Sequence, residues 1–382
     1  MSRQMYKLML RSVLLGSLLA TALPYLAFAA EVSPPAKALW SRTMGQSGLR
    51  RFYSTGADLG ELVNRQVSYQ LARRLETAWR AQHPGTTPQA NAFASEAEGF
   101  VVQYDSLVPL PVTLQRPLFI RTLARTAKRF EPGKLNSINQ RYDLGLLYAP
   151  SQQTYLGIGL AIEQTRADLK YVQGNTSVNA IGPRLDAGVQ LSPILALGLR
   201  LEEVTFTGDN EVMVSTMTGS MTGSMNIARQ LDYQRRYLQT EAIIRLTRTQ
   251  LPFLPANLQV GGMAAWHYLD LRYESQRNSL GQTVVEPFGN RERLGVFRSG
   301  VFVSANIGNN GLWNPYTELL LDREIDNNMT APLDDRTSVL WRAGLARLLG
   351  TGKRISMEYQ HSQSRHGARE RDNLLLVAVI DF

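Results

Sequence analysis

The sequence contains no cysteine among its 382 residues, which excludes disulfide bridges, thiolate metal sites and cysteine nucleophiles. It has only four histidines, His83, His267, His361 and His366, and they are too scattered to form a metal-binding motif. The glycine-containing stretch at 350–354 lacks the strand-to-helix context of a phosphate-binding loop. We therefore expect no cofactor and no bound metal.

Long apolar runs are lacking as well. Beyond the first 29 residues, no segment supplies the ~20 uninterrupted apolar residues of a transmembrane helix. Basic and acidic residues are mixed along the chain, which argues against nucleic acid as a partner. The exported protein is expected either to be soluble or to cross a membrane as strands.

Residues 1–29 have the organisation of a secretory signal peptide, with a basic start, an apolar stretch at 13–28 and an A-x-A site at 27–29. The basic residues are Arg3, Lys7 and Arg11. Pro24 and the small-residue site disfavour a membrane anchor, so we expect a mature chain that begins near Ala30. Loss of the three basic residues lowers the formal charge from +9 to +6, since 9 − 3 = 6.

The chain after residue 116 alternates apolar and polar residues, as β-strands with one apolar face do. The clearest strand is 181–191, where Ile181 and Leu185 alternate with Arg184 and Asp186. Similar segments are 138–148, 155–169, 195–206, 238–245, 258–273, 297–304, 317–322, 339–345, 355–360 and 373–382. A poorly alternating segment at 116–128 completes an even number of strands, twelve. We predict an all-β fold, a transmembrane up-and-down antiparallel barrel over 116–382.

Charged residues on the polar face are expected to line the barrel lumen. They are Arg141, Asp143, Arg184, Asp186, Glu241, Arg245, Arg298, Glu318, Arg342 and Glu358. Alternation does not reveal which face is wet, so a soluble β-sandwich is the alternative. Aromatic residues near strand ends, such as Tyr148, Trp313 and Trp341, favour the membrane barrel because such barrels carry aromatic girdles.

The connections are expected to alternate between short inner turns and longer outer loops, as in outer-membrane barrels. The expected outer loops are 170–179, 208–232, 274–292, 325–336 and 365–372. The longest of the short inner connections is 247–257. The repeat MTGSMTGSM at 217–225 is expected to be a disordered loop tip, with a surface contact as the alternative. The last strand ends on Phe382, which we interpret as an assembly signal.

Residues 116–382 resemble the β-domain of autotransporters, the type V secretion translocators of the Gram-negative cell outer membrane. The resemblance rests on YLGIGLAIEQTRADL at 155–169, NPYTELLLDREI at 314–325, WRAGLARLL through ISMEYQHSQ at 341–363, and the C-terminal LLLVAVIDF. It implies contact with outer-membrane lipids, delivery by periplasmic chaperones and insertion by the barrel-assembly machinery. It also implies a lumen that conducts or holds one segment of chain.

The N-terminal segment, 30–115, has only 86 residues and no repeat, unlike the long passengers usual in that family. A helix is predicted over 56–82 from its apolar stripe. Its basic residues are Arg65, Arg73, Arg74 and Arg80, which could lie against lumen acids such as Glu241, Glu318 and Glu358. The alternative is a helix packed under the barrel in the periplasm.

No catalytic site is expected, so the chain is not predicted to be an enzyme. His361 should face lipid, but its same-face neighbour is Gln363 where a phospholipase would need serine. Asp334, Asp335 and His366 could form a protease site only through the geometry of two loops. The leading hypothesis is a barrel that anchors or translocates its short N-terminal segment. A stand-alone channel or structural barrel, with that segment periplasmic or plugging the pore, is the alternative, and a barrel hydrolase comes third.

Deletion of Phe382 should impair barrel assembly, because the closing strand loses its terminal apolar contact. Membrane fractionation and heat-modifiable gel mobility measure assembly. A normal amount of heat-modifiable barrel in the outer membrane would contradict the assigned role of Phe382.

Overall fold

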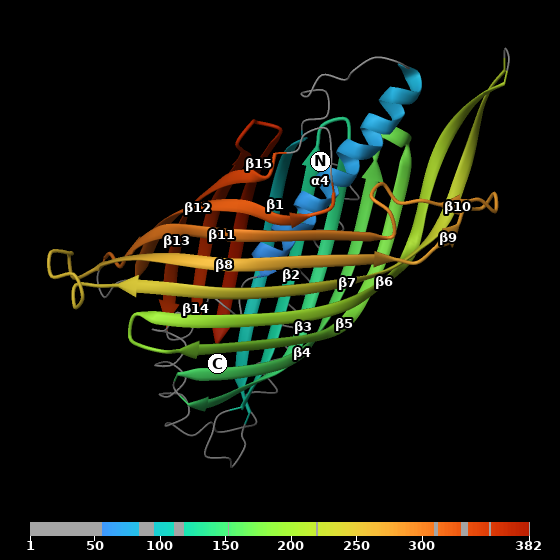
Figure 1. Ribbon diagram of the computed structural model, residues 1–382. Helices are drawn as coiled ribbons and strands as arrows, with labels where there is room; N and C mark the ends of the chain where they lie inside the picture. Colours follow the sequence, from blue (N-terminus) through green and yellow to red (C-terminus); the bar gives the residue numbers. More distant parts are fainter. Residues whose placement is uncertain are drawn as a thin grey trace.

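The computed structural model describes residues 56–83, 95–110, 118–151, 153–218, 221–308, 312–329, 335–350 and 353–381. The described strands form one closed β-barrel, and helix α4 (Gly56–Gln82) runs inside it (Figure 1). Within these residues, no helix is long and apolar enough to cross a membrane. The predicted all-β barrel with a short N-terminal helix is confirmed.

Thirteen described strands make up the barrel wall. They are β1 (Ser95–Pro109), β2 (Leu118–Glu131), β3 (Leu135–Ser151), β4 (Thr154–Leu169), β5 (Gly174–Gln190), β6 (Leu195–Thr218), β7 (Met221–Leu246), β8 (Leu258–Tyr273), β11 (Arg291–Ala305), β12 (Trp313–Asn327), β13 (Thr337–Gly350), β14 (Lys353–Ser364) and β15 (Arg369–Asp381). Between β8 and β11, the short strands β9 (Gln276–Arg277) and β10 (Thr283–Val284) pair with each other, and a 3-10 turn, η2 (Lys170–Val172), follows β4.

The wall closes through a parallel pair. The strands from β2 to β15 correspond to the twelve predicted strands and pair antiparallel, whereas β1 lies between β2 and β15. It pairs parallel with β15, from Ser95 opposite Arg369 to Leu107 opposite Asp381. The prediction of an even strand number is therefore wrong, because one parallel pair allows an odd-numbered wall to close.

Strand β1 lies within 30–115, so the structure places the first barrel strand ahead of the predicted start at residue 116. Its faces do not differ clearly in polarity. Val101, Gln103 and Asp105 are buried on one face, while Val102 is exposed on the other. Since neither face of β1 is purely apolar, alternation gave no strand signal there.

The outer face of the wall is an apolar belt. On β5, Leu185 is 48% exposed, whereas the adjacent Arg184 is buried at 2%. Exposed apolar side chains on the same face of the wall include Leu144, Ile158, Ile181, Leu199, Val301, Leu319, Ile325, Val339, Ile355 and Met357. Contact with lipid accounts for so large an apolar surface, because alternate residues of membrane barrels face the hydrocarbon.

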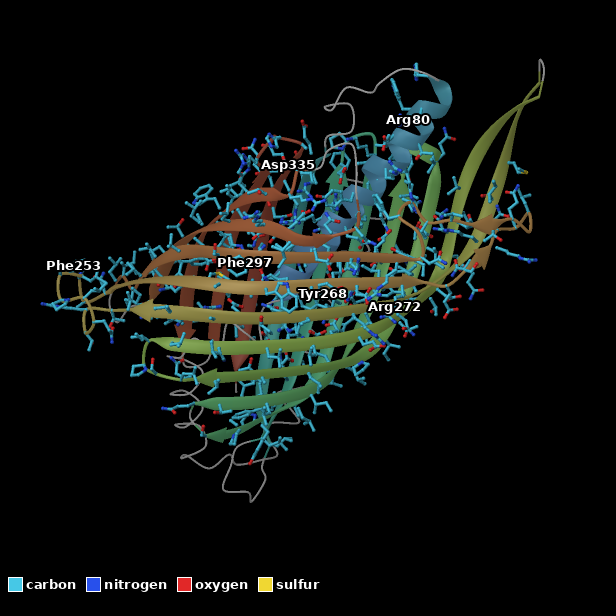
Figure 2. The ribbon with its side chains drawn as sticks, in the orientation of Figure 1. Arg80, Phe253, Tyr268, Arg272, Phe297 and Asp335 are labelled. Carbon is cyan, nitrogen blue, oxygen red and sulfur yellow. The ribbon has the colours of Figure 1, made fainter. Side chains whose placement is uncertain are left out.

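The two ends of the barrel differ. The β8–β11 and β12–β13 connections and the β14–β15 turn lie at one end, here called the long-loop rim. The C-terminal end of β15 and the β13–β14 turn lie at the other, the short-turn rim. Figure 2 shows Phe253, in the turn before β8, and Arg272, near the end of β8, at opposite ends of the wall. Short turns are periplasmic and long loops extracellular in outer-membrane barrels.

The predicted outer loop 208–232 is mostly strand. Strands β6 and β7 are 24 and 26 residues long and form a hairpin that projects beyond the wall at the long-loop rim (Figure 1). They pair from Leu195 with Ile244 up to Thr218 with Met221, so most of the repeat at 217–225 extends the hairpin. Residues 219–220 lie outside the described residues.

Substitution of Leu185 by arginine should destabilise the barrel by about 2–4 kcal/mol, because the charge would enter the apolar belt. A matched control is Leu191→Arg, at an exposed position just beyond the end of β5, where the cost should fall to about 0–1 kcal/mol. Unfolding free energies in lipid vesicles measure both. Equal costs would mean that this part of β5 does not cross the hydrocarbon.

Candidate functional site

Helix α4 occupies the long-loop half of the lumen. The predicted bounds 56–82 are confirmed, and Leu62 and Tyr69 are buried at 0% and 2% exposure. The N-terminal end of α4 lies near the middle of the barrel and its C-terminal end at the long-loop rim (Figure 1). In Figure 2, Arg80 marks this C-terminal end. Since an apolar stripe alone does not stabilise an isolated helix, packing against the wall must hold α4 in place.

One side of α4 packs against apolar side chains of the wall. Leu59, Leu62 and Tyr69 join a buried cluster with inward residues from β7, β8, β11 and the connection after β12. These wall residues are Tyr237, Leu269, Leu271, Leu294, Val296 and Met329. Near the rim, Ala72 contacts Ala368 in the β14–β15 turn. The helix is therefore fixed in rotation by an apolar face.

The first turns of α4 carry two acids that pair with wall arginines. Arg298 of β11 donates to Asp58 at 2.6 Å and to Glu61 at 2.8 Å. Arg342 of β13 donates to Asp58 at 3.0 Å. Arg298 is completely buried, so its charge has no access to water. Acids at this end of α4 also suit the positive end of the helix dipole.

The next turns of α4 present the opposite charge. Arg65 donates to Asp322 at 2.7 Å and approaches Glu324 at 3.4 Å. Tyr69 donates to Glu324 at 2.7 Å, and Arg369 of β15 donates to the same carboxylate at 3.1 Å. Within about two turns of α4, helix acids pair with wall arginines and a helix arginine pairs with wall acids.

The predicted partners of the helix arginines are wrong. Arg65 meets Asp322 and Glu324, as given above, while Arg73 and Arg80 pair with Glu76 of the helix itself. Of the wall acids that were expected, Glu318 pairs with Arg342, Glu358 accepts hydrogen bonds from Tyr316 and Gln360, and Glu241 accepts one from Gln239. Alternation identifies the inward face of a strand but not the height of the helix in the lumen.

A second charge network lies on the wall of β3–β7. Arg141 donates to Asp143 at 2.8 Å and to Glu163 at 2.6 Å, and its guanidinium also bonds Glu202. Arg184 donates to Asp186 at 2.8 Å and also bonds Asp143. Arg200 donates to Asp186 at 2.8 Å, and Arg235 bonds Glu163 and Glu202. All these side chains are buried, so mutual pairing takes the place of hydration.

The structure brings four predicted lumen charges, Arg141, Asp143, Arg184 and Asp186, into this one network. Glu241, Arg298, Glu318 and Arg342 are also buried, whereas Arg245 and Glu358 are partly exposed. Phe382 lies outside the described residues. Sequence periodicity missed Glu163, Arg200 and Glu202, although each occupies an inward position of a predicted strand. It also missed Arg235, which lies just before the predicted strand 238–245 and belongs to the longer β7.

A cavity of about 210 Å³ separates α4 from the wall of β3–β8. We call it the helix–wall cavity. Its helix side includes Val63, Val67 and Leu71 together with Gln66 and Gln70, and its wall side includes Phe206 and Tyr233. Glu163 and Arg235 of the second network line it on the side of mid-lumen. Toward the long-loop rim its lining is charged, with Arg74 and Arg229 beside Glu286.

The described histidines give no lumen metal site. His361, Glu370 and Asp372 bring ligand atoms within 4.8 Å of one another, but His361 and Asp372 lie on the outward face of β14 and β15. Asp335 accepts a hydrogen bond from the backbone nitrogen of His366, at 2.6 Å. In this hydrogen bond the imidazole of His366 takes no part. Asp334 lies outside the described residues.

Several solved structures are similar to the chain. The translocator domain of the autotransporter NalP from Neisseria meningitidis has 10% identity and a TM-score of 0.47, over 60% of this chain and 77% of that one. The β-domain of the Bordetella autotransporter BrkA has 15% identity and a TM-score of 0.44, over 64% and 89%. The CymD monoaromatic hydrocarbon channel has 10% identity and a TM-score of 0.43, over 70% and 83%. No protein-family model and no curated protein matches the sequence.

The predicted similarity to autotransporter β-domains is thus found among solved structures, together with similarity to a channel. At these identities the likeness concerns the barrel fold alone. The chain has an outer-membrane β-barrel fold, which its own strand pairing and apolar belt define.

Substitution of Arg298 by glutamine should destabilise the protein by about 3–5 kcal/mol, because Asp58, Glu61 and Asp322 would lose a buried countercharge. Arg323→Gln, at an exposed position of β12, is the matched control and should change stability little. Denaturant unfolding in vesicles compares the two variants. A small effect of both would show that the charges of α4 do not hold it to the wall.

Proposed function

We propose that the chain is an outer-membrane channel whose lumen is plugged by its own helix α4. The proposal rests on the buried ion pairs that hold α4 against the wall. Its ion pairs reach β11, β12 and β13, and Arg369 of β15 covers the ring of Tyr69 at 4.6 Å. Buried ion pairs contribute little net stability over hydrated charges, since desolvation offsets their attraction. They add specificity to the apolar packing around Leu62 and Tyr69, and their small net stability suits a plug that can move.

The direction of α4 supports a plug over surface display. The chain enters α4 near mid-lumen and leaves it at the long-loop rim (Figure 1). Strand β1 starts at the same rim, with Ser95 opposite Arg369. A displayed segment that precedes α4 would have to pass outward beside the helix. Contacts block such a path on the β2 side, through Arg129, and on the β11 side, through Arg298, which leaves the helix–wall cavity on the β3–β8 side.

One observation favours the alternative, anchoring or translocation of the N-terminal segment in the manner of an autotransporter. Helix α4 lies in the lumen and precedes β1, the first described barrel strand, as a chain halted in translocation would. A tag placed after Ala30 separates the two functions on intact cells. Protection of the tag from external protease supports the plugged channel, and cleavage supports display. Both functions assume an outer-membrane location, periplasmic chaperones and the barrel-assembly machinery, and neither requires catalysis by the chain.

A disulfide between α4 and the wall should lock the channel closed. Ala72 and Ala368 pack in one small buried cluster, which makes this the place where cysteines can be introduced to join α4 to the β14–β15 turn. The sequence has no native cysteine to interfere. We expect the oxidised double variant Ala72→Cys/Ala368→Cys to show few openings in planar bilayers, and reduction to restore them.

The two single-cysteine variants are the controls, since each carries the same change without the cross-link. Their opening frequency should not respond to oxidant. If the cross-linked and reduced double variants open equally often, α4 is not the gate.

A further inference from the structure

The helix–wall cavity has the size of a small-molecule site. Its volume is about 210 Å³, while an engineered apolar cavity of about 150 Å³ is enough to bind benzene. The cavity is therefore large enough for one aromatic ring with a small substituent. Its residues come from α4, from the six neighbouring wall strands β3–β8 and from the loop before β11, so both plug and wall would contact a ligand.

The aromatic side chains of Phe206, Tyr233 and Tyr273 line the wall side of the cavity beside polar side chains that include Asn139, Thr165 and Asn210. The rings of Phe206 and Tyr233 stack with centroids 4.4 Å apart and an interplanar angle of 5°. Tyr273 continues this row, with its ring centroid 5.3 Å from that of Tyr233. From α4 the lining includes the aliphatic side chains of Val63, Val67 and Leu71 as well as Gln66 and Gln70, which donate hydrogen bonds to Tyr273. A flat apolar body fits between an aromatic row and an aliphatic helix face.

The charged end of the cavity holds two guanidinium groups around one carboxylate. Arg229 donates to Glu286 at 2.6 Å, and Arg74 donates to the same carboxylate at 3.2 Å. The Arg229 side chain is 9% exposed and that of Arg74 is 31% exposed. Glu286 thus faces an excess of positive charge, and an arginine guanidinium has donors for more than one anionic oxygen.

We propose that the helix–wall cavity binds a small aromatic molecule with one anionic group, whose ring packs against Phe206 and Tyr233 and whose anion meets Arg74 and Arg229. The Glu286 carboxylate shows how this pair of guanidinium groups binds an anion, because it forms ion pairs with both. This inference rests on the proposed channel function and names the class of solute that would occupy the lumen beside α4. A bound anion would compete with Glu286 for the arginine that α4 contributes, and so would couple solute binding to the plug.

Calorimetric titration of the full-length protein in detergent tests the proposal with benzoate and with benzamide, its uncharged analogue of similar shape. Benzoate should bind about tenfold more tightly, the ratio expected for one charge-assisted hydrogen-bonded contact. Arg229→Gln should reduce benzoate affinity to that of benzamide and leave benzamide unchanged. Arg236→Gln is the matched control, because Arg236 lies on the same strand, faces outward and pairs with Glu203. It should bind both probes as the native chain does.

Heat-modifiable gel mobility establishes that each variant is folded, and Arg74→Gln replaces Arg229→Gln if the latter does not fold. Equal affinity for benzoate and benzamide, or no saturable binding of either by folded protein, would overturn the proposal. So would an unchanged preference for benzoate in the arginine variants. Failure here leaves the cross-linking result untouched, because closure by the disulfide between α4 and the β14–β15 turn requires no ligand.

Discussion

Buried charged side chains in the lumen have no access to water and must pair with one another. The arrangement of the lumen and of α4 depends on this constraint. Arg298 is fully buried, and the wall alone offers it Asp322, while α4 supplies Asp58 and Glu61. An uncompensated buried charge costs several kcal/mol, so the position of α4 is determined at the height where its acids reach Arg298 and Arg342. The apolar cluster around Leu62 and Tyr69 then sets its rotation.

The two charge networks divide the barrel into unlike sides. On β3–β7 the wall arginines and acids pair with one another, as Arg141 does with Glu163 and Glu202. On β11–β13 the pairing is shared with the helix. The helix–wall cavity lies on the first side, where the wall can satisfy its own charges while α4 stands away from it. A plug that moved would therefore disturb the β11–β13 side and leave the β3–β7 side largely intact.

Sequence periodicity predicted much of the wall because lipid and lumen impose opposite preferences on alternate residues. Leu185 and Arg184 show this directly, as do the confirmed bounds of α4, which follow from a helical apolar stripe. Periodicity did not predict strand β1, because Gln103 and Asp105 share its buried face with Val101. The ion-pair partners of Arg65 were not predicted for another reason. Asp322 and Glu324 are 257 and 259 residues away in the sequence, and no local pattern encodes the height of a helix inside a barrel.

Helix α4 also supports the parallel pair of β1 and β15, here called the seam. Parallel pairs are slightly less stable per residue than antiparallel pairs, so this seam is the weaker junction of a wall otherwise closed by antiparallel strands. Arg369, the first residue of β15, lies opposite Ser95 at the start of the seam, and the same side chain covers the ring of Tyr69 and pairs with Glu324. Helix α4 therefore contacts the strand pair at the point where its pairing begins. Withdrawal of Tyr69 would remove that support, which links the position of the plug to the closure of the wall.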